Sequence, residues 1–366
     1  MGLELHRFFA IAASCFFSAI ATILFIPWIR KVGEKLRIID KPDERKQHRT
    51  PLVHIGGLGM AAGTLITLII AWYFNNLNFN YAGNPSLLLL VFISSLIYCL
   101  IGLTDDLFGL SPWSRLTTQF LIATCLWFCG FHLRVIDISL IFSETTLIQI
   151  PILIDYFITV IWIVGVTNAI NWMDGLDGLA AGISLMLFAG ITLISLNNDF
   201  IYISLFASAL SGSCLGFIKY NRFPAEIYMG DGGSYFLGFN LATLSILASS
   251  NIIKDNAGNE ILIVSIIIPF ILLSLPIIDM INVISSRIRS KKSPFFPDRN
   301  HLHHRLIKRG YSHLNSVRII YILTQYCIGL ALLYMGGITG KIIFSITTSI
   351  AILFLFHIKN NRGNNI

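Results

Sequence analysis

The sequence predicts an all-α, polytopic membrane protein with about eleven transmembrane helices. Three observations lead to this fold class: the composition, the number of long apolar runs, and the way positive charge is divided between them. Of the 366 residues, 55% are hydrophobic and only 12% are charged, and the mean hydropathy is +0.74. Soluble domains carry about 25% charged residues, so an ordinary soluble domain is excluded.

Apolar runs of roughly 17 to 25 residues are long enough to cross a bilayer, and they do so as helices, which satisfy their own backbone groups. The first run ends in Arg30 and Lys31 rather than in a small-residue cleavage site, so we expect a retained membrane helix. The fifth run is short and the fourth is interrupted by polar residues, which makes ten the alternative count. The candidate runs cover residues 8–29, 55–74, 86–104, 114–131, 156–170, 179–196, 200–218, 232–250, 261–284, 319–336 and 338–357. Together they form one integral membrane domain, residues 1–366.

Lysines and arginines gather in alternate loops. The loops after odd-numbered runs, together with the C-terminal tail, hold 22 of the 26 Lys and Arg residues. By the positive-inside rule these loops are cytoplasmic and the N-terminus lies outside. Topology thus explains the net charge of +7, and no nucleic-acid partner is predicted. The cytoplasmic loops are expected at about 30–54, 105–114, 168–178, 219–231 and 285–318.

The stretch from Asn168 to Gly182 is central, because it sets acidic side chains and glycines between two membrane runs. Asn171, Asp174 and Asp177 are spaced by three residues, which places their oxygens on one face if the stretch is helical. Polar groups in such a position are costly and usually functional. Their oxygens and the glycine backbone suit a Mg²⁺ ion that carries a phosphate ester. Capping of the next helix by Asp177 is the alternative.

Two further carboxylate motifs lie in the same set of loops. Asp105 and Asp106 end the third run, with Arg115 soon after, and adjacent carboxylates need a metal, a cation or a proton to offset their repulsion. Helix capping explains one of them at most. Asp231 lies in Met-Gly-Asp-Gly-Gly-Ser at the start of the eighth run, which repeats the chemistry of Asp174.

Basic and histidine residues accompany these carboxylates. Arg49 and His54 precede the paired glycines Gly56-Gly57, which allow a close approach of the backbone. In the long loop after the ninth run, three histidines stand beside two arginines, and zinc binding, phosphate binding and a solvated basic patch are all open. Without nearby cysteines, and with cationic neighbours, phosphate is favoured over zinc. These residues are Arg299, His301, His303, His304 and Arg305.

All these motifs fall on the face that the charge count makes cytoplasmic. A transporter would instead place ionisable residues near the bilayer midplane. Only Asp279 comes close to that pattern, and structural pairing is the simpler explanation for it. The chemistry therefore favours phosphoryl transfer from a soluble nucleotide to a lipid acceptor. A phosphate monoester acceptor, with a second pKa of about 6, is mostly ionised and needs positioning more than a base.

Taken together, the motifs resemble those of the polyprenyl-phosphate N-acetylhexosamine-1-phosphate transferases, and most of all bacterial undecaprenyl-phosphate N-acetylglucosamine-1-phosphate transferases. The resemblance runs from about residue 30 to 315 in the same order. It rests on Asp40-Lys-Pro42, Gly56-Gly57, Thr104-Asp-Asp106, Asn168-Ala-Ile-Asn171-x-x-Asp174-Gly-Leu-Asp177-Gly, Met229-Gly-Asp-Gly-Gly-Ser234 and His301-x-His303-His304.

The resemblance implies transfer of N-acetylglucosamine 1-phosphate from a UDP-N-acetylhexosamine to undecaprenyl phosphate, with release of UMP. It implies an eleven-helix protein of the bacterial inner membrane that initiates the synthesis of O-antigen or of another cell-surface polysaccharide. A homodimer is one open assembly state. The open alternatives are another UDP-N-acetylhexosamine or a phospho-MurNAc-pentapeptide donor, and, in other classes, a CDP-alcohol phosphotransferase or a transporter.

The resemblance also implies roles for individual residues. Asn171 and Asp231 would hold Mg²⁺, with Mn²⁺ as a substitute, and Asp174 would lie close by. Asp177 would contact the uridine, and Asp105 and Asp106 would face the lipid phosphate. The histidine loop would close over the donor, with His303 and His304 nearest the chemistry and His301, Arg299 and Arg305 binding substrate, as would Arg49. Many members of the family carry a Lys two residues before the Arg that follows the Asp pair, where this sequence has Trp113, and the resemblance then leaves Arg115 to supply the diphosphate contact alone.

Overall fold

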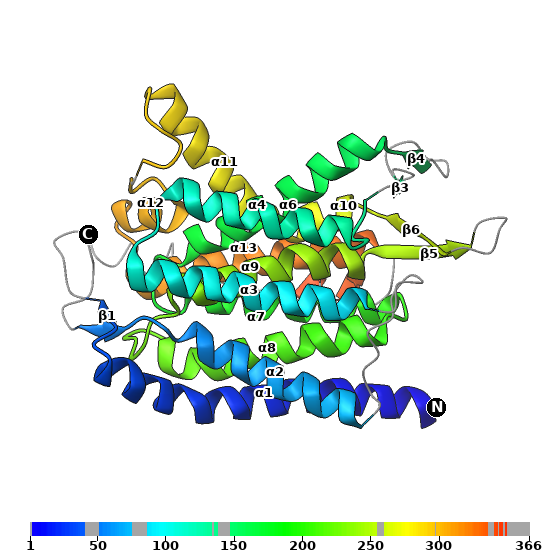
Figure 1. Ribbon diagram of the computed structural model, residues 1–366, viewed down its shortest axis with the longest axis horizontal. Helices are drawn as coiled ribbons and strands as arrows, with labels where there is room; N and C mark the ends of the chain where they lie inside the picture. The colour runs from blue at the N-terminus through cyan, green and yellow to red at the C-terminus, as the bar shows by residue number, and fades with distance from the viewer. Residues whose placement is uncertain are drawn as a thin grey trace.

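Long helices packed side by side form most of the protein (Figure 1). A computed structural model describes residues 2–40, 51–74, 86–133, 135–137, 147–254, 260–296, 298–335, 340–342, 344–346 and 348–349. The principal helices are α1 (Gly2–Lys35), α2 (Gly57–Tyr73), α3 (Leu87–Phe108), α4 (Pro112–Phe128), α6 (Ile152–Met173), α7 (Leu179–Asn197), α8 (Ile201–Asn221), α9 (Gly230–Ala248) and α13 (His313–Tyr334). Three shorter helices are α10 (Ile267–Leu272), α11 (Ser274–Arg289) and α12 (Leu302–Lys308).

Six helices in the described part of the chain are long and apolar enough to cross a membrane: α1 from His6, α3, α6, α7, α8 and α13. Helix α2 is apolar but shorter, at 17 residues. The polytopic membrane protein predicted from composition is confirmed. The predicted eleventh run lies mostly outside the described residues, and the count of eleven helices stays a prediction.

Helix α9 is the centre of the bundle, because every residue from Gly232 to Ala248 is buried. Its small residues let neighbouring backbones come close. A side chain at Gly57 of α2 would collide with the backbone of Gly233 of α9. The close backbone approach predicted for the paired glycines is therefore confirmed, and its partner is the helix that begins with the Asp231 motif.

The predicted ninth run, residues 261–284, is not one helix. It begins in strand β6 (Glu260–Val264), continues through α10, and starts again as α11 at Ser274. Pro276 has no N–H, so it cannot provide the helical hydrogen bond to the carbonyl of Leu272, where α10 ends. The apolar run predicted a straight span because hydropathy does not register this missing donor.

The prediction of an all-α fold is wrong in one region. A four-stranded sheet of order β4-β3-β6-β5 also contains β3 (Val135–Asp137), β4 (Leu147–Gln149) and β5 (Ser250–Lys254). Strands β5 and β6 are antiparallel, whereas β3 and β6 are parallel. The β-branched residues that form β5 and β6 favour strands. A second, two-stranded antiparallel sheet joins β1 (Ile39–Asp40) to β2 (Leu52–Val53).

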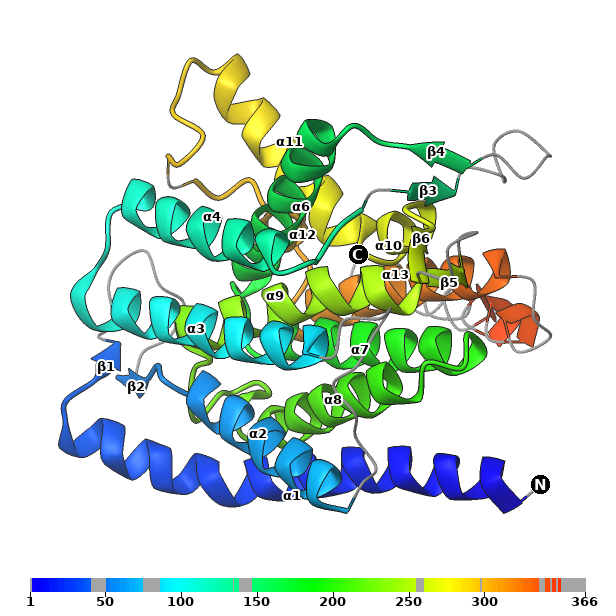
Figure 2. The same ribbon diagram turned by 45° about the vertical axis from the view of Figure 1, so that its right-hand side comes forward.

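The bundle has two distinct ends. Figures 1 and 2 show β1, β2 and the α3–α4 turn at one end, and the N-terminus with the four-stranded sheet at the other. At the end opposite the α3–α4 turn, the buried carboxylate of Asp155 accepts hydrogen bonds from Trp127, Thr159 and the backbone N–H of Leu133. Where the structure describes them, the loops that follow odd-numbered runs and those that follow even-numbered runs thus lie at opposite ends of the bundle, as the charge pattern predicted.

Candidate active site

Asp105 is held in the turn between α3 and α4. Its side chain is 7% exposed and accepts hydrogen bonds from the backbone N–H of Leu110 at 2.8 Å and from Arg115 Nη1 at 2.7 Å. The turn forms because Gly109 adopts a left-handed conformation (φ 66°) and Ser111 caps α4. This corner fixes both the carboxylate and the guanidinium.

Asp106 caps the first turn of α9. Its two carboxylate oxygens accept hydrogen bonds from the backbone N–H groups of Asp231, at 2.9 Å, and Gly232, at 3.1 Å. These N–H groups have no partner inside their own helix, and a carboxylate there is favoured by the helix dipole. His54 Nε2 lies 3.2 Å from the Asp106 carbonyl oxygen. Asp106 thus fixes where α9, and with it Asp231, begins.

Asp231 lies between an amide and a guanidinium. Asn171 Nδ2 donates to Asp231 Oδ1 at 2.7 Å and to Ser234 Oγ at 2.9 Å. Arg115 Nη1 lies 3.5 Å from Asp231 Oδ2, so this arginine contacts both Asp105 and Asp231. Residues from α3, α4, α6 and α9 therefore meet in one network.

Asp174 and Asp177 follow the end of α6. Burial, together with the nearby carboxylates of Asp106 and Asp177, raises the pKa of Asp174 to about 7. Negative charge is therefore concentrated at this end of the bundle, where a bound cation would stabilise it.

Asp177 is tied to the loop before α9. Its Oδ2 accepts a hydrogen bond from the backbone N–H of Ala225 at 3.0 Å, and its own N–H donates to His313 Nε2 at 3.2 Å. Next to it, the N–H of Gly178 donates to Asn221 Oδ1 at 3.0 Å. These contacts give Asp177 a structural partner on the loop before α9, so it holds that loop against the end of α6.

His303 is buried against the stretch that contains Asp174. Its side chain packs on Gly175 so closely that a methyl group there would collide with the ring. Within the described part of the chain, neither ring nitrogen has a hydrogen-bond partner. Burial, with a smaller contribution from the neighbouring His304, His301 and His313, lowers the pKa of His303 to about 3, so the imidazole is neutral at pH 7. A buried imidazole without a hydrogen-bond partner is rare in a folded protein, which makes His303 a candidate site residue.

Asp279 organises the histidine segment. Asp279 is only 3% exposed. Its carboxylate accepts hydrogen bonds from His301 Nδ1 at 2.9 Å and from the backbone N–H of Leu302 at 2.8 Å. Arg305, which is itself exposed, lies 3.6 Å away. The structural pairing expected for Asp279 is confirmed, and its partner is the loop whose histidines were predicted as functional.

Two residues that sequence reasoning missed tie this loop to α6. The guanidinium of Arg287 lies 4.9 Å from the ring centre of Trp172 and binds Asp298 at 3.0 and 3.3 Å. The ring of Trp172 also contacts His301, at 5.5 Å between centroids. Trp172 lies inside the stretch from Asn168 to Gly182, and this position could have marked it as a site residue. Its partner Arg287 lies 115 residues away in sequence and carried no such signal.

The remaining predicted residues are more peripheral. His304 is half-buried, and burial together with nearby positive charge lowers its pKa; Arg299 is exposed. Arg49 lies outside the described residues. Trp113 packs against Phe295 of the histidine loop at 5.4 Å between ring centroids. Its ring therefore supplies an aromatic contact between α4 and this loop.

The donor set fits a magnesium ion held in part by substrate. Among the described residues, no group of three or more His, Cys, Asp and Glu is arranged to hold a metal. Asp231 supplies a carboxylate that is held in place by the amide nitrogen of Asn171, and it shares Arg115 with the carboxylate of Asp105. Mg²⁺ usually takes one or two carboxylates and completes its shell with phosphates and water.

Helices that can span a membrane, with a network of carboxylates and an arginine at one end, define a polytopic membrane protein with one candidate site. Comparison with known proteins identifies the class. Residues 88–249 match the model of glycosyl transferase family 4. That segment contains the α3–α4 corner, the central motif and α9, and hence the whole Asn171–Asp231–Arg115 network. The chain belongs to this family.

Named relatives extend the similarity beyond that segment. A probable undecaprenyl-phosphate N-acetylglucosaminyl 1-phosphate transferase of Bacillus subtilis is 30% identical over 87% of this chain and 83% of its own. A decaprenyl-phosphate N-acetylglucosaminephosphotransferase of Mycobacterium leprae is 32% identical over 83% and 79%. An undecaprenyl-phosphate alpha-N-acetylglucosaminyl 1-phosphate transferase of Escherichia coli O157:H7 is 28% identical over 80% and 75%. Family membership sets aside the CDP-alcohol phosphotransferase and transporter alternatives.

Proposed function

We propose that this protein transfers N-acetylglucosamine 1-phosphate from UDP-N-acetylglucosamine to undecaprenyl phosphate. A phosphate oxygen of the lipid attacks the sugar-bearing phosphorus of the donor, the bond to the bridging oxygen breaks, and UMP leaves. The product is a lipid diphosphate sugar of the kind that begins O-antigen or another surface polysaccharide. The names of the relatives support this reaction, and the observation that carries it is the meeting of Asn171, Asp231 and Arg115 at the start of α9.

Each group in the network has a part in this reaction. When bound, Mg²⁺ would neutralise charge on the donor diphosphate, and Asn171 and Asp231 would hold it, with Asp174 nearby. Mn²⁺ would substitute in the same oxygen site. Arg115 would stabilise the charge of the leaving phosphate from its fixed place against Asp105.

We assign positioning roles to Asp105 and Asp106. Both oxygens of each carboxylate accept hydrogen bonds from the protein, as described above, so neither carboxylate is set apart to remove a proton. The acceptor phosphate, with a second pKa of about 6, is largely ionised at neutral pH and needs no strong base. The pair would therefore build the pocket wall and fix Arg115 and α9.

The histidine loop would bind the donor. The neutral, unpartnered ring of His303 over Gly175 supports a hydrogen bond to substrate, with His304 beside it. Arg299 and Arg305, at the exposed edge, and Arg49 would attract the charged nucleotide, and Asp177 would face the uridine. Asp279 holds the loop in place through His301 and would act on the reaction only through it.

The test is product release from membranes that contain the protein. With UDP-N-acetylglucosamine, undecaprenyl phosphate and Mg²⁺ present together, UMP should form, and omission of any one of them should abolish it. A panel of UDP-N-acetylhexosamines and the phospho-MurNAc-pentapeptide donor would identify the sugar. Release of UDP instead of UMP, or release that does not depend on the lipid, would contradict the proposal.

We also propose that the site faces the cytoplasm, at the inner membrane of a bacterium. In a variant without its native cysteines, single cysteines at Arg299 and at Asp199 would report the two ends of the bundle. An impermeant thiol reagent applied to intact cells should label Asp199→Cys and spare Arg299→Cys. The reverse labelling pattern would invert the topology.

A further inference from the structure

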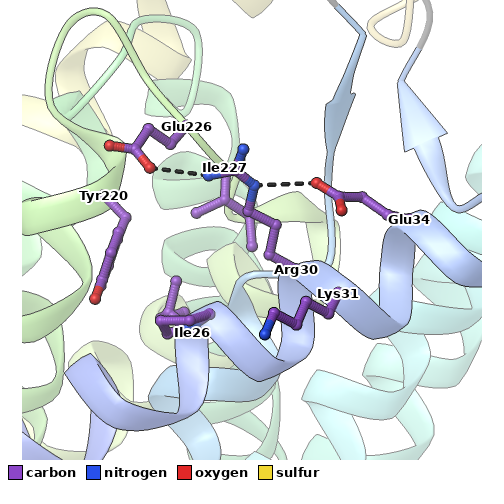
Figure 3. A pocket seen from close by; sticks show the side chains of 8 residues that line it. Ile26, Arg30, Lys31, Glu34, Tyr220, Glu226 and Ile227 are labelled. Atoms are coloured by element: carbon purple, nitrogen blue, oxygen red, sulfur yellow. Dashed lines mark hydrogen bonds and ion pairs between the residues drawn. The ribbon is translucent and has the colours of Figure 1, made fainter.

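A cavity of about 340 Å³ lies between α1 and α8, away from the acidic site, and Figure 3 shows the side chains that line it. Its floor is apolar, because Ile26 and Ile227 are almost fully buried. Its rim is charged, with Arg30, Lys31 and Glu34 from α1 and Glu226 from the loop after α8.

Pro27 shapes this cavity. A proline inside a helix leaves the carbonyl four residues earlier without its usual donor, here the carbonyl of Ile23. The hydroxyl of Tyr220 donates to that carbonyl at 3.1 Å. Tyr220 is thus fixed against α1 as one wall of the cavity, and α8 is tied to α1 at this level.

The charges on the rim are arranged in two parts. Arg30 binds Glu34 Oε1 at 3.1 Å and Glu226 Oε2 at 2.9 Å. Each glutamate uses one oxygen for this arginine, and among the described residues the other oxygen accepts no hydrogen bond. Lys31 is exposed and has no carboxylate partner in the described part of the chain. The rim therefore offers one ammonium donor for an anion and two carboxylate oxygens for a cation.

The position along α1 corresponds to the headgroup layer of a bilayer. The candidate membrane span of α1, His6–Lys35, has 30 residues, which at 1.5 Å per residue is about 45 Å, against a hydrocarbon core of about 30 Å. Because Arg30, Lys31 and Glu34 lie in its last turns, these turns extend beyond the core. The exposed ring of Trp28, next to the cavity in sequence, is typical of a membrane interface.

From these observations we infer that the cavity binds the headgroup of a zwitterionic aminophospholipid, with its phosphate on Lys31 and its primary ammonium on Glu34 and Glu226. A primary ammonium donates hydrogen bonds to both glutamates, whereas a quaternary ammonium has none to donate. The apolar floor takes the first carbons of the lipid. A purely anionic headgroup would place no cation against the two carboxylates.

The cavity is also connected to the candidate active site. Glu226 belongs to the rim, and the N–H of its neighbour Ala225 donates to Asp177. A lipid that holds Glu226 would therefore steady the loop that Asp177 contacts. The lipid site itself does not depend on the proposed reaction.

The test is lipid retention measured by native mass spectrometry on the full-length protein. The protein is released from an equal mixture of phosphatidylethanolamine, phosphatidylcholine and phosphatidylglycerol with the same acyl chains. We expect phosphatidylethanolamine to exceed each of the others about fivefold, which corresponds to the upper range for exposed ion pairs. Glu226→Gln and Glu34→Gln should remove the preference over phosphatidylcholine, and Lys31→Gln should weaken retention of both lipids.

The matched control is Arg289→Gln, an exposed charge at the end of α11, which should leave retention unchanged. Equal retention of the three lipids, preference for phosphatidylglycerol, or no effect of Lys31→Gln would overturn the inference. So would full displacement of the lipid by soluble glycerophosphoethanolamine, because the apolar floor would then have no part in binding. All of these outcomes are independent of whether the protein transfers phosphosugar.

Discussion

Asp279→Asn is predicted to reduce turnover although the residue is placed to touch no substrate. Its carboxylate accepts from His301 Nδ1 and from the Leu302 N–H, so it fixes the beginning of α12 and hence the ring of His303 over Gly175. Asparagine has about the same volume but a single acceptor oxygen, and its amide nitrogen would face a donor.

The magnitude follows from these contacts. A hydrogen bond to a charged group contributes about 1.5–3 kcal/mol, and the more exposed Arg305 at 3.6 Å adds little. Loss of one such bond from the arrangement that places His303 costs about 2 kcal/mol, which shifts the equilibrium between the competent and the displaced loop about thirtyfold toward the displaced one. We expect turnover at saturating substrates to fall by up to that factor.

The assay is UMP release per folded protein, and the control is a second buried carboxylate. Asp155→Asn, at the opposite end of the bundle, removes a comparable set of hydrogen bonds around an equally buried group. It should lower thermal stability and leave turnover unchanged. In a double-mutant cycle, Asp279→Asn and His301→Ala should be strongly non-additive. Normal turnover of Asp279→Asn, or simple additivity, would refute the reasoning.

Three other substitutions test separate parts of the site. Asp231→Asn should lose nearly all turnover, because a metal-binding oxygen is replaced without a change of volume. A high Mg²⁺ concentration should restore turnover partly at most. Near-normal turnover at an ordinary Mg²⁺ concentration would show that Asp231 does not bind the metal. Asp106→Asn should lose the same fraction of turnover at every pH from 6 to 9 at saturating donor, because a positioning role does not depend on protonation of the acceptor. A deficit that vanishes at alkaline pH would show that Asp106 acts as a general base. Gly175→Ala should displace the ring of His303 and lower turnover at least tenfold, which corresponds to about 1.4 kcal/mol. The control is Gly165→Ala, which should be neutral because the nearest neighbour of Gly165 leaves room for a methyl group. Equal effects of the two substitutions would show that the contact between Gly175 and His303 is unimportant for turnover.

Much of the candidate site was predictable because its members carry local signals. Asp105, Asp174 and Asp231 each stand among glycines or other carboxylates at the end of an apolar run, and the charge pattern puts those ends on one face. The structure brings the elements that carry them together. Their exact partners were not predictable, because the bonds of Asp106 to the start of α9 and of Asn171 to Asp231 join residues 125 and 60 positions apart.

The errors in the fold have a similar origin. Hydropathy predicted a helix across residues 261–284, although β6 pairs with β5 and β3 and the helical part is divided before Pro276. Apolar β-branched residues satisfy both a membrane helix and a buried strand, so periodicity alone does not separate them. The sequence predicts only structural pairing for Asp279, because its partner, His301, becomes its neighbour only in three dimensions.

The most direct test of the central claim follows the donor's second phosphorus. UDP-N-acetylglucosamine labelled with ³²P at the β-position is incubated with the protein, undecaprenyl phosphate and Mg²⁺, and the lipid is then extracted. If sugar 1-phosphate is transferred, the label enters the lipid fraction together with the sugar, the nucleotide product is unlabelled UMP, and Asp231→Asn produces neither. Label that stays in a nucleotide product, UDP, while the sugar enters the lipid would contradict the account.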